Sequence, residues 1–152
     1  MKKRILALAV LCSVFVLLAG CEREKHRLDE EVRRLCAKDG GVKVYETVKF
    51  TPKLLDRAGR IWIPLIEDAK ESDEYYYVSE MVYLKEGDPD MYRISHKIIR
   101  RSDNKVLGEF VSYARRGGDI LSPPFHPSSF SCRDINGLSN FENLIFLKEN
   151  DK

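Results

Sequence analysis

The amino-terminal segment of this chain has the pattern of an export signal, so we expect only the residues after it to form the folded domain. Residues 2–4 are basic, and a continuous apolar run from Ile5 to Leu18 follows them. That run is shorter than the roughly 20 residues of a transmembrane helix, and it leads through two small residues to Cys21. A basic start, a short apolar run and small residues are typical of an export signal. We therefore expect a signal peptide over residues 1–20 and a single folded domain over 21–152.

The end of the apolar run carries a recognisable motif. Leu18-Ala19-Gly20-Cys21 resembles the lipobox of bacterial lipoproteins. The resemblance implies diacylation of the Cys21 thiol, cleavage before Cys21 and acylation of the new amino terminus. An uncleaved signal anchor, or an ordinary signal peptide cut after an A-x-A pattern, would leave Cys21 unexplained. Glu22 replaces the Asp that holds enteric-type lipoproteins at the inner membrane, which implies the outer membrane, facing the periplasm.

The remaining composition is that of one soluble domain on a lipid anchor. Roughly 130 residues can bury a core but are too few for two domains. Removing three basic residues with the signal leaves 23 Lys and Arg against 24 Asp and Glu, a net charge of about −1. A nucleic-acid-binding protein would have a strong basic excess, so this class is excluded.

Two cysteines remain after export. Cys12 leaves with the signal and Cys21 takes the lipid, so Cys36 and Cys132 are left. In an oxidising periplasm they are most simply one disulfide. The alternative is a reactive or metal-binding pair, and neither C-x-x-C spacing nor clustered histidines support it.

The first segment of the mature chain has helical periodicity. Leu28, Val32, Leu35 and Cys36 fall on one stripe, which predicts an amphipathic helix over 22–38 that ends at a glycine pair. Cys36 lies on that stripe and therefore faces the body of the domain.

The middle of the chain has the alternation and composition of β-strands. We expect strands over 42–48, 75–85, 91–101 and 106–115, and a short last strand over 144–147. Residues 102–105 predict a hairpin turn, because Asp and Asn tolerate positive φ. With a two-residue loop, one face of the hairpin would share the following apolar residues: Tyr92, Ile94, Ile98, Leu107, Val111 and Tyr113. The fold class is thus α+β, with an amino-terminal amphipathic helix packed on a small antiparallel sheet and one disulfide.

A second resemblance covers about a tenth of the chain. The segment LCAKDGGVKVYETV, from Leu35 to Val48, is similar to one in small uncharacterised lipoproteins of Gram-negative bacteria. The resemblance implies the same class of protein and a paired Cys36, and it carries over no catalytic residue.

Three histidines, His26, His96 and His126, are the candidates for chemistry. None has ligand spacing for a metal, and we expect no metal and no cofactor. A small hydrolase using His126 or His96 is an alternative, although no G-x-S-x-G motif is present. His96 lies on the predicted apolar face, where a core imidazole is the simpler interpretation.

A set of basic residues on the predicted hairpin is the best polar candidate. It could bind anionic lipid, peptidoglycan or an acidic protein, or it could be a solvated sheet face. Its members are Lys97, Arg100, Arg101, Arg115 and Arg116. The run Tyr75-Tyr76-Tyr77 could line a groove or simply alternate between core and surface.

We expect a non-enzymatic binding or structural role in the cell envelope, with the protein held on the membrane by its lipid anchor. The expected partner is an envelope protein or peptidoglycan. The first alternative is an inhibitor or binding module for a soluble periplasmic enzyme, acting through a loop over 123–131. The second is the hydrolase described above.

Overall fold

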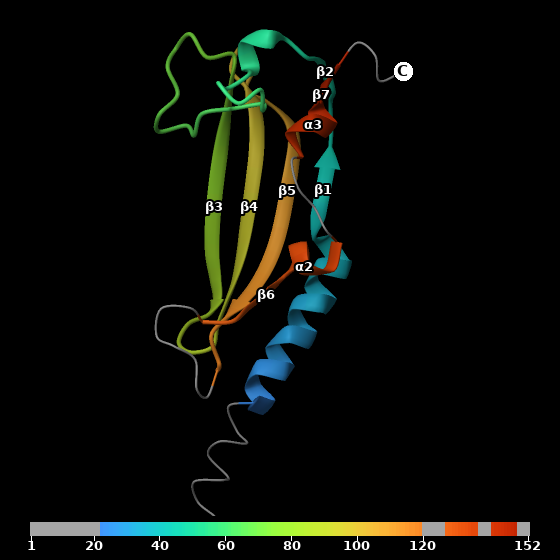
Figure 1. Ribbon diagram of the computed structural model, residues 1–152, viewed down its shortest axis with the longest axis vertical. Helices are drawn as coiled ribbons and strands as arrows, with labels where there is room; N and C mark the ends of the chain where they lie inside the picture. Colours follow the sequence, from blue (N-terminus) through green and yellow to red (C-terminus); the bar gives the residue numbers. More distant parts are fainter. Residues whose placement is uncertain (1–21, 120–126, 137–140, 149–152) are drawn as a thin grey trace, which may run out of the picture.

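The computed structural model describes residues 22–119, 127–136 and 141–148. The predicted signal, Cys21 and His126 lie outside these residues. The fold is α+β, as predicted: one long helix precedes a mostly antiparallel sheet (Figure 1). Within the described part of the chain, no helix is both long enough and apolar enough to cross a bilayer.

The amino-terminal helix spans residues 22–39 and ends at Gly40. Its predicted stripe is correct, because Leu28, Val32 and Cys36 are buried. Gly41 follows with a φ of 108°, a conformation that glycine adopts without steric cost. This glycine turns the chain directly from the helix into the first strand.

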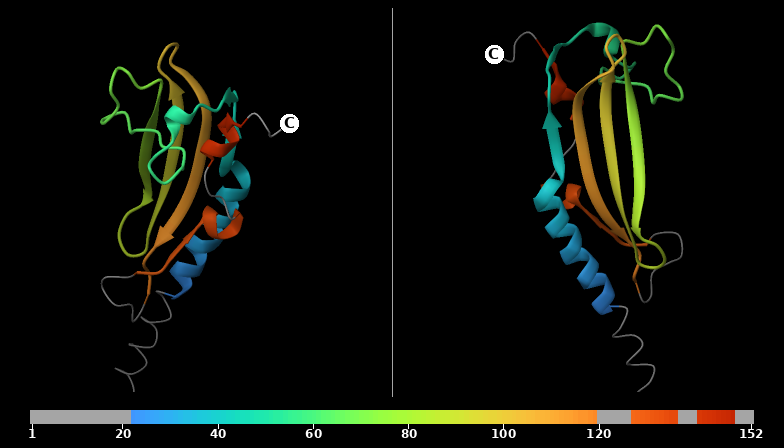
Figure 2. Two further views of the ribbon diagram at one scale, coloured as in Figure 1. Left: turned by 45° about the horizontal axis from the view of Figure 1, so that its top comes forward. Right: turned by 180° about the vertical axis from the view of Figure 1, so that it is seen from behind.

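The main sheet has the strand order β1-β5-β4-β3, and a short β6 pairs with the far end of β5. Its strands are β1 (Gly41–Val44), β3 (Tyr75–Lys85), β4 (Asp90–Arg100), β5 (Lys105–Arg116) and β6 (Ser129–Ser131). The helix lies along one side of this sheet, and the segment that joins β2 to β3 gathers at the opposite end from the helix start (Figure 2).

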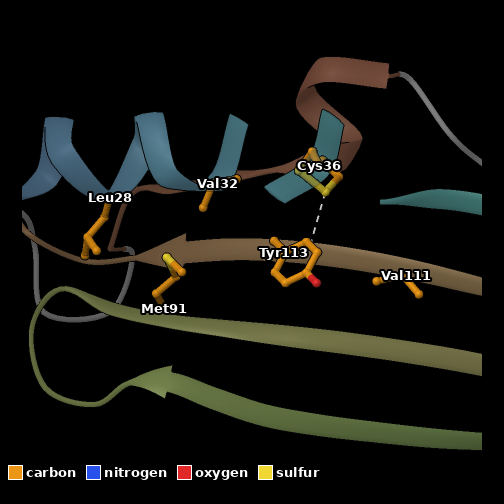
Figure 3. Close-up of a cluster of buried hydrophobic side chains, with 7 residues drawn as sticks. Leu28, Val32, Cys36, Met91, Val111 and Tyr113 are labelled. Atoms are coloured by element: carbon orange, nitrogen blue, oxygen red, sulfur yellow. Dashed lines mark hydrogen bonds between the residues drawn. A yellow bond between two sulfur atoms is a disulfide. The ribbon is translucent and has the colours of Figure 1, made fainter. Parts of the chain in front are cut away.

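The disulfide joins the helix to α2 (Cys132–Asn136) and confirms the predicted pairing. Cys36 and Cys132 are both buried, with their Cα atoms 5.4 Å apart. Together with Leu28 and Val32 they contact Met91, Val111 and Tyr113 of the sheet (Figure 3). The first core cluster is therefore built between the helix and one sheet face, with the disulfide at one end of it.

The β4–β5 hairpin exists, and Ile98 and Leu107 share a face as predicted, but the predicted face of Val111 and Tyr113 is wrong. The loop has four residues, 101–104, because Arg100 pairs with Lys105, and a bulge between Ile98 and Ile99 shifts the register again. Tyr113 therefore pairs with Arg93, not with Ile94. A one-residue change in register turns side chains to the opposite face. Val111 and Tyr113 consequently face the helix, while Tyr92, Ile94 and Ile98 lie on the other face.

That other face carries a second core cluster at the end far from the helix start. Its buried members are Ile63, Ile98, Leu107, Ile145 and Phe146. The expected strand over 42–48 is split, because the chain bends at Tyr45 and β2 is only Val48–Lys49. The expected last strand is also shorter, since α3 (Glu142–Ile145) takes its first half and only β7 (Phe146–Leu147) pairs, in parallel with β2. The remaining element is a 3-10 turn, η1 (Pro52–Leu54).

Gly108 allows α3 to approach the sheet. A Cβ at this position would lie 2.6 Å from Cδ1 of Ile145 and 3.1 Å from the Lys43 carbonyl oxygen. A separation below 3 Å requires the Ile145 side chain to shift, so a side chain at position 108 would disturb this close packing. The close approach brings Phe141 and Glu142, at the start of α3, over the sheet.

Candidate functional site

Four aromatic rings from separate segments meet on the sheet face that points away from the helix. His96 of β4 lies directly across from Phe110 of β5, and Tyr77 lies on the neighbouring edge strand β3. Phe141 joins them from the residue before α3. Cross-strand neighbours share a face, so β-sheet register places the first three side chains together and α3 supplies the fourth.

The four rings form a closed circuit. The ring centroids are 6.2 Å apart for Tyr77 and His96, and 6.1 Å apart for His96 and Phe110. Phe110 and Phe141 are 6.1 Å apart, and Phe141 and Tyr77 are 5.8 Å apart. The His96 and Phe110 rings are nearly parallel, at 3°, whereas Tyr77 meets its neighbours edge-on. We call this set the four-ring cluster.

The four-ring cluster lines an open hollow of about 310 Å³. Leu65 and Glu142 complete its lining. The hollow is at the lower end of the range of volumes of small-molecule sites, which suits one side chain or a small headgroup better than a large ligand. No serine, threonine or cysteine is among the described residues that line it.

Burial and one carboxylate set the electrostatics of the hollow. The Tyr77 hydroxyl donates a hydrogen bond to Oε1 of Glu142. Burial raises the pKa of Tyr77, and this hydrogen bond to a carboxylate raises it further. Burial lowers the pKa of His96, and the nearby Glu142 carboxylate opposes that shift only in part. At neutral pH the site therefore presents a neutral phenol and a neutral imidazole beside one carboxylate.

The five predicted basic residues do not form one patch. Because β4 and β5 are antiparallel, Arg100 pairs with Lys105 at one end of the hairpin and Arg116 pairs with Asp90 at the other. Arg115 is buried and bonded to Asp29 of the helix, with a side chain only 2% exposed. The prediction of a shared patch is thus wrong in its geometry.

The basic residues are also paired with acceptors. Arg100 Nη1 lies 2.6 Å from Oε1 of Glu46, and Arg116 Nη2 lies 2.6 Å from Oδ2 of Asp90. Lys97 is 3.9 Å from Glu109, and Arg101 Nε donates to the Asp73 carbonyl oxygen. These partners neutralise most of the positive charge that the sequence suggested for an anionic ligand.

The histidines have separate environments. His26 is exposed on the helix, with Nε2 3.9 Å from Oε1 of Glu22, while His96 lies in the four-ring cluster. No group of three potential metal ligands occurs in the described ranges. Glu142 bonds to Tyr77, and the described residues that line the hollow include no serine, threonine or cysteine beside His96, so these residues do not by themselves form the acid–base–nucleophile chain of the hydrolase alternative. Residues 123–126 of the predicted inhibitory loop lie outside the described residues, and residues 127–131 lie within them.

The three consecutive tyrosines alternate between environments. Tyr75 packs edge-on against Phe146 in the second core cluster, and Tyr77 joins the four-ring cluster. Tyr76 lies on the opposite face, below the Arg101 guanidinium. Sequence reasoning identified Tyr77 and His96 as candidates but missed Phe110, Phe141 and Glu142. An aromatic residue directly before a short apolar helix was the only local signal for the last two.

The edge strand β3 is the second notable feature of the sheet. Its outer edge has one backbone contact with a described segment, a bridge between Tyr77 and Leu65. Four consecutive large apolar residues follow on the rest of the strand, all well exposed: Met81 (53%), Val82 (43%), Tyr83 (46%) and Leu84 (47%). Soluble proteins normally protect such an edge with charges, prolines or a covering segment.

Comparison with known family models, curated proteins and solved structures finds no match to this chain.

Proposed function

We propose that this chain is a cell-envelope lipoprotein, anchored through Cys21 at the periplasmic face of the outer membrane, which binds an extended segment of another envelope protein without catalysing a reaction. The observation that carries the binding role is the exposed apolar edge of β3. Unpaired backbone groups and apolar side chains on a sheet edge are what a partner strand needs in order to add to the sheet.

The position of the helix is consistent with the anchor. The helix begins at residue 22, directly after Cys21, at the same end of the molecule as the β3–β4 turn and the end of β5 (Figure 1). With lipid on Cys21, this end of the domain faces the bilayer and the strands run away from it. Among the described residues, the β3 edge beyond the Leu65–Tyr77 bridge then stays open to the periplasm.

A partner of different sequence fits this edge better than a second copy. Symmetric pairing of two β3 edges would be antiparallel, so the two molecules would point in opposite directions. Their Cys21 residues would then lie at opposite ends of the dimer, which one membrane leaflet cannot hold. A segment from another protein has no such restriction.

The anchor predicts a defined amino terminus. Mass spectrometry of the protein extracted from membranes is expected to give an amino-terminal peptide that starts at triacylated Cys21. Cys21→Ser should abolish the lipid, because only the thiol forms the thioether. An intact Met1 on the native membrane protein would contradict the anchor.

The edge predicts a specific crosslink. A photo-crosslinking amino acid at position 81 should capture one defined envelope protein in cells, because a paired strand lies within reach of the Met81 position. Val82→Lys should reduce this product at least about tenfold, since a lysine on the edge opposes strand pairing.

Ile135→Lys is the matched control, because it adds the same charge at an exposed position on α2. It should leave the crosslink unchanged. Crosslinks between two copies of this chain, or a product insensitive to Val82→Lys, would contradict the proposal. Capture of a soluble periplasmic enzyme would favour the inhibitor alternative instead.

A further inference from the structure

We propose that the four-ring cluster and Glu142 form a binding site for the cationic end of a lysine or arginine side chain, carried by the segment that pairs with β3. This inference rests on the proposed function and names the chemistry by which the partner is recognised.

The ring arrangement suits a cation. Aromatic faces carry partial negative charge, so a cation within about 6 Å of several ring centroids is attracted by each of them. Tyr77, His96, Phe110 and Phe141 line the hollow, with neighbouring centroids 5.8–6.2 Å apart. His96 adds an aromatic face without a competing charge while it is neutral. An opening lined by several aromatic rings is a type of site that attracts ammonium groups.

Glu142 makes the hollow selective for positive charge. Its carboxylate lines the hollow, and the Tyr77 hydroxyl is its hydrogen-bond partner. Among the described residues that line the hollow there is no lysine or arginine. No ion pair joins Glu142 to a lysine or arginine of the described segments. A carboxylate against aromatic rings, without its own cation, has the charge complementary to an incoming ammonium or guanidinium group.

The position of the hollow favours a protein side chain over a lipid headgroup. His96 lies six residues along β4 from Asp90, which is at the end of the sheet near the helix start. At 3.3 Å per residue this is about 20 Å above that end, beyond the headgroups of the anchoring leaflet. The β3 edge is much closer to the hollow, because β3 is the strand next to β4, which carries His96.

Ser79 leaves a path from the edge to the hollow. It lies on β3 directly across from His96, on the same face and between Tyr77 and Met81. A small exposed side chain at this position lets a long side chain pass from a strand beyond β3 over the sheet to the rings. Lysine and arginine have apolar stems that can lie on such a surface while the charged end reaches a polar group.

The test uses the full-length protein in maltoside micelles, which contain no cationic headgroup. Aromatic NMR resonances of Tyr77, His96 and Phe110 are followed during titration with n-butylammonium, a mimic of the lysine side-chain end. Saturable shifts with a millimolar dissociation constant are expected. The neutral analogue n-butanol should bind at least about tenfold more weakly, because it lacks the charge that Glu142 and the ring faces attract.

Two variants separate the contributions of charge and rings. Glu142→Gln should weaken n-butylammonium binding at least about tenfold, and Phe110→Leu should weaken it several-fold while it keeps an apolar side chain. Glu30→Gln, which removes a carboxylate with a 79% exposed side chain from the helix, is the matched control and should have no effect. Equal binding of n-butanol, or unchanged binding to the Glu142→Gln variant, would overturn the site.

Two further outcomes show whether the cation comes from a protein or from a lipid, and whether the cation site or the strand pairing has failed. Tighter binding of phosphoethanolamine than of n-butylammonium would overturn the side-chain assignment and indicate a lipid headgroup. The crosslink at position 81 does not depend on the cation, so its persistence without n-butylammonium binding would reject only this inference. Its absence despite n-butylammonium binding would reject the proposed strand pairing.

Discussion

Replacing Cys36 and Cys132 together with alanine is expected to lower the free energy of unfolding by about 4 kcal/mol. The disulfide joins residues 96 positions apart, and closing a loop of about 100 residues removes roughly 4.7 kcal/mol of chain entropy from the unfolded state. The buried Cys132 sulfur also accepts a hydrogen bond from the Tyr113 backbone N–H at 3.2 Å, and alanine removes this acceptor. Because Cys36 lies on the buried stripe of the helix, loosening of the helix on the sheet should accompany the loss.

Thermal and urea unfolding would measure this effect. For a domain of this size the melting temperature should fall on the order of 15 °C. Each single cysteine variant should lose nearly as much as the double variant, because either change removes the crosslink. The reduced wild-type protein is the control and should resemble the double variant. A melting temperature within a few degrees of the oxidised wild type would show that other contacts hold the helix in place.

Arg115→Met is expected to lower the free energy of unfolding by about 3–5 kcal/mol, because it removes one partner of a buried ion pair. Arg115 Nε donates to Asp29 Oδ1 at 2.8 Å, and Nη1 donates to the Gly117 carbonyl oxygen at 2.8 Å and to Ser128 Oγ at 2.9 Å. One guanidinium therefore connects the helix, the end of β5 and the segment before β6. Methionine fills similar space but leaves these acceptors unpaired.

Chemical denaturation of matched variants would test the role of Arg115. Arg34→Met makes the same change in an exposed pair with Glu31 on the helix surface, and it should have little measurable effect. Asp29→Leu combined with Arg115→Met should recover part of the loss, since both charges are then absent, although the carbonyl groups stay unpaired. Equal stability of the Arg115→Met and Arg34→Met variants would contradict a structural role for the buried guanidinium.

Much of the fold follows from local patterns. The stripe of Leu28, Val32 and Cys36 has the 3.6-residue period of a helix and is buried as that period requires. The long strands appear close to their expected boundaries, because alternation and turn residues act over a few neighbours. The pairing of Cys36 with Cys132 could be expected because only two cysteines remained.

These local patterns could not predict the register of the β4–β5 pair. The prediction assumed a two-residue loop, whereas a four-residue loop and a bulge near Ile98 give a different pairing. The predicted pairing and the observed pairing are both compatible with the same alternation of apolar residues. The choice is made by packing, which places Val111 and Tyr113 against the helix and leaves Ile94 and His96 on the other face. The basic residues that had seemed to form one patch are separated by the antiparallel course of β4 and β5, which places Arg100 and Arg116 at opposite ends of the hairpin.

The sequence by itself determined the long helix, the three long strands, the buried stripe and the cysteine pairing, because each depends on residue spacing or on a count. Only the tertiary structure decided that Tyr77, His96, Phe110 and Phe141 line one hollow together with Glu142. These residues come from four segments, and no local period relates them. Their meeting depends on strand order, on a bulge and on the absence of a side chain at Gly108, which together let α3 approach the sheet.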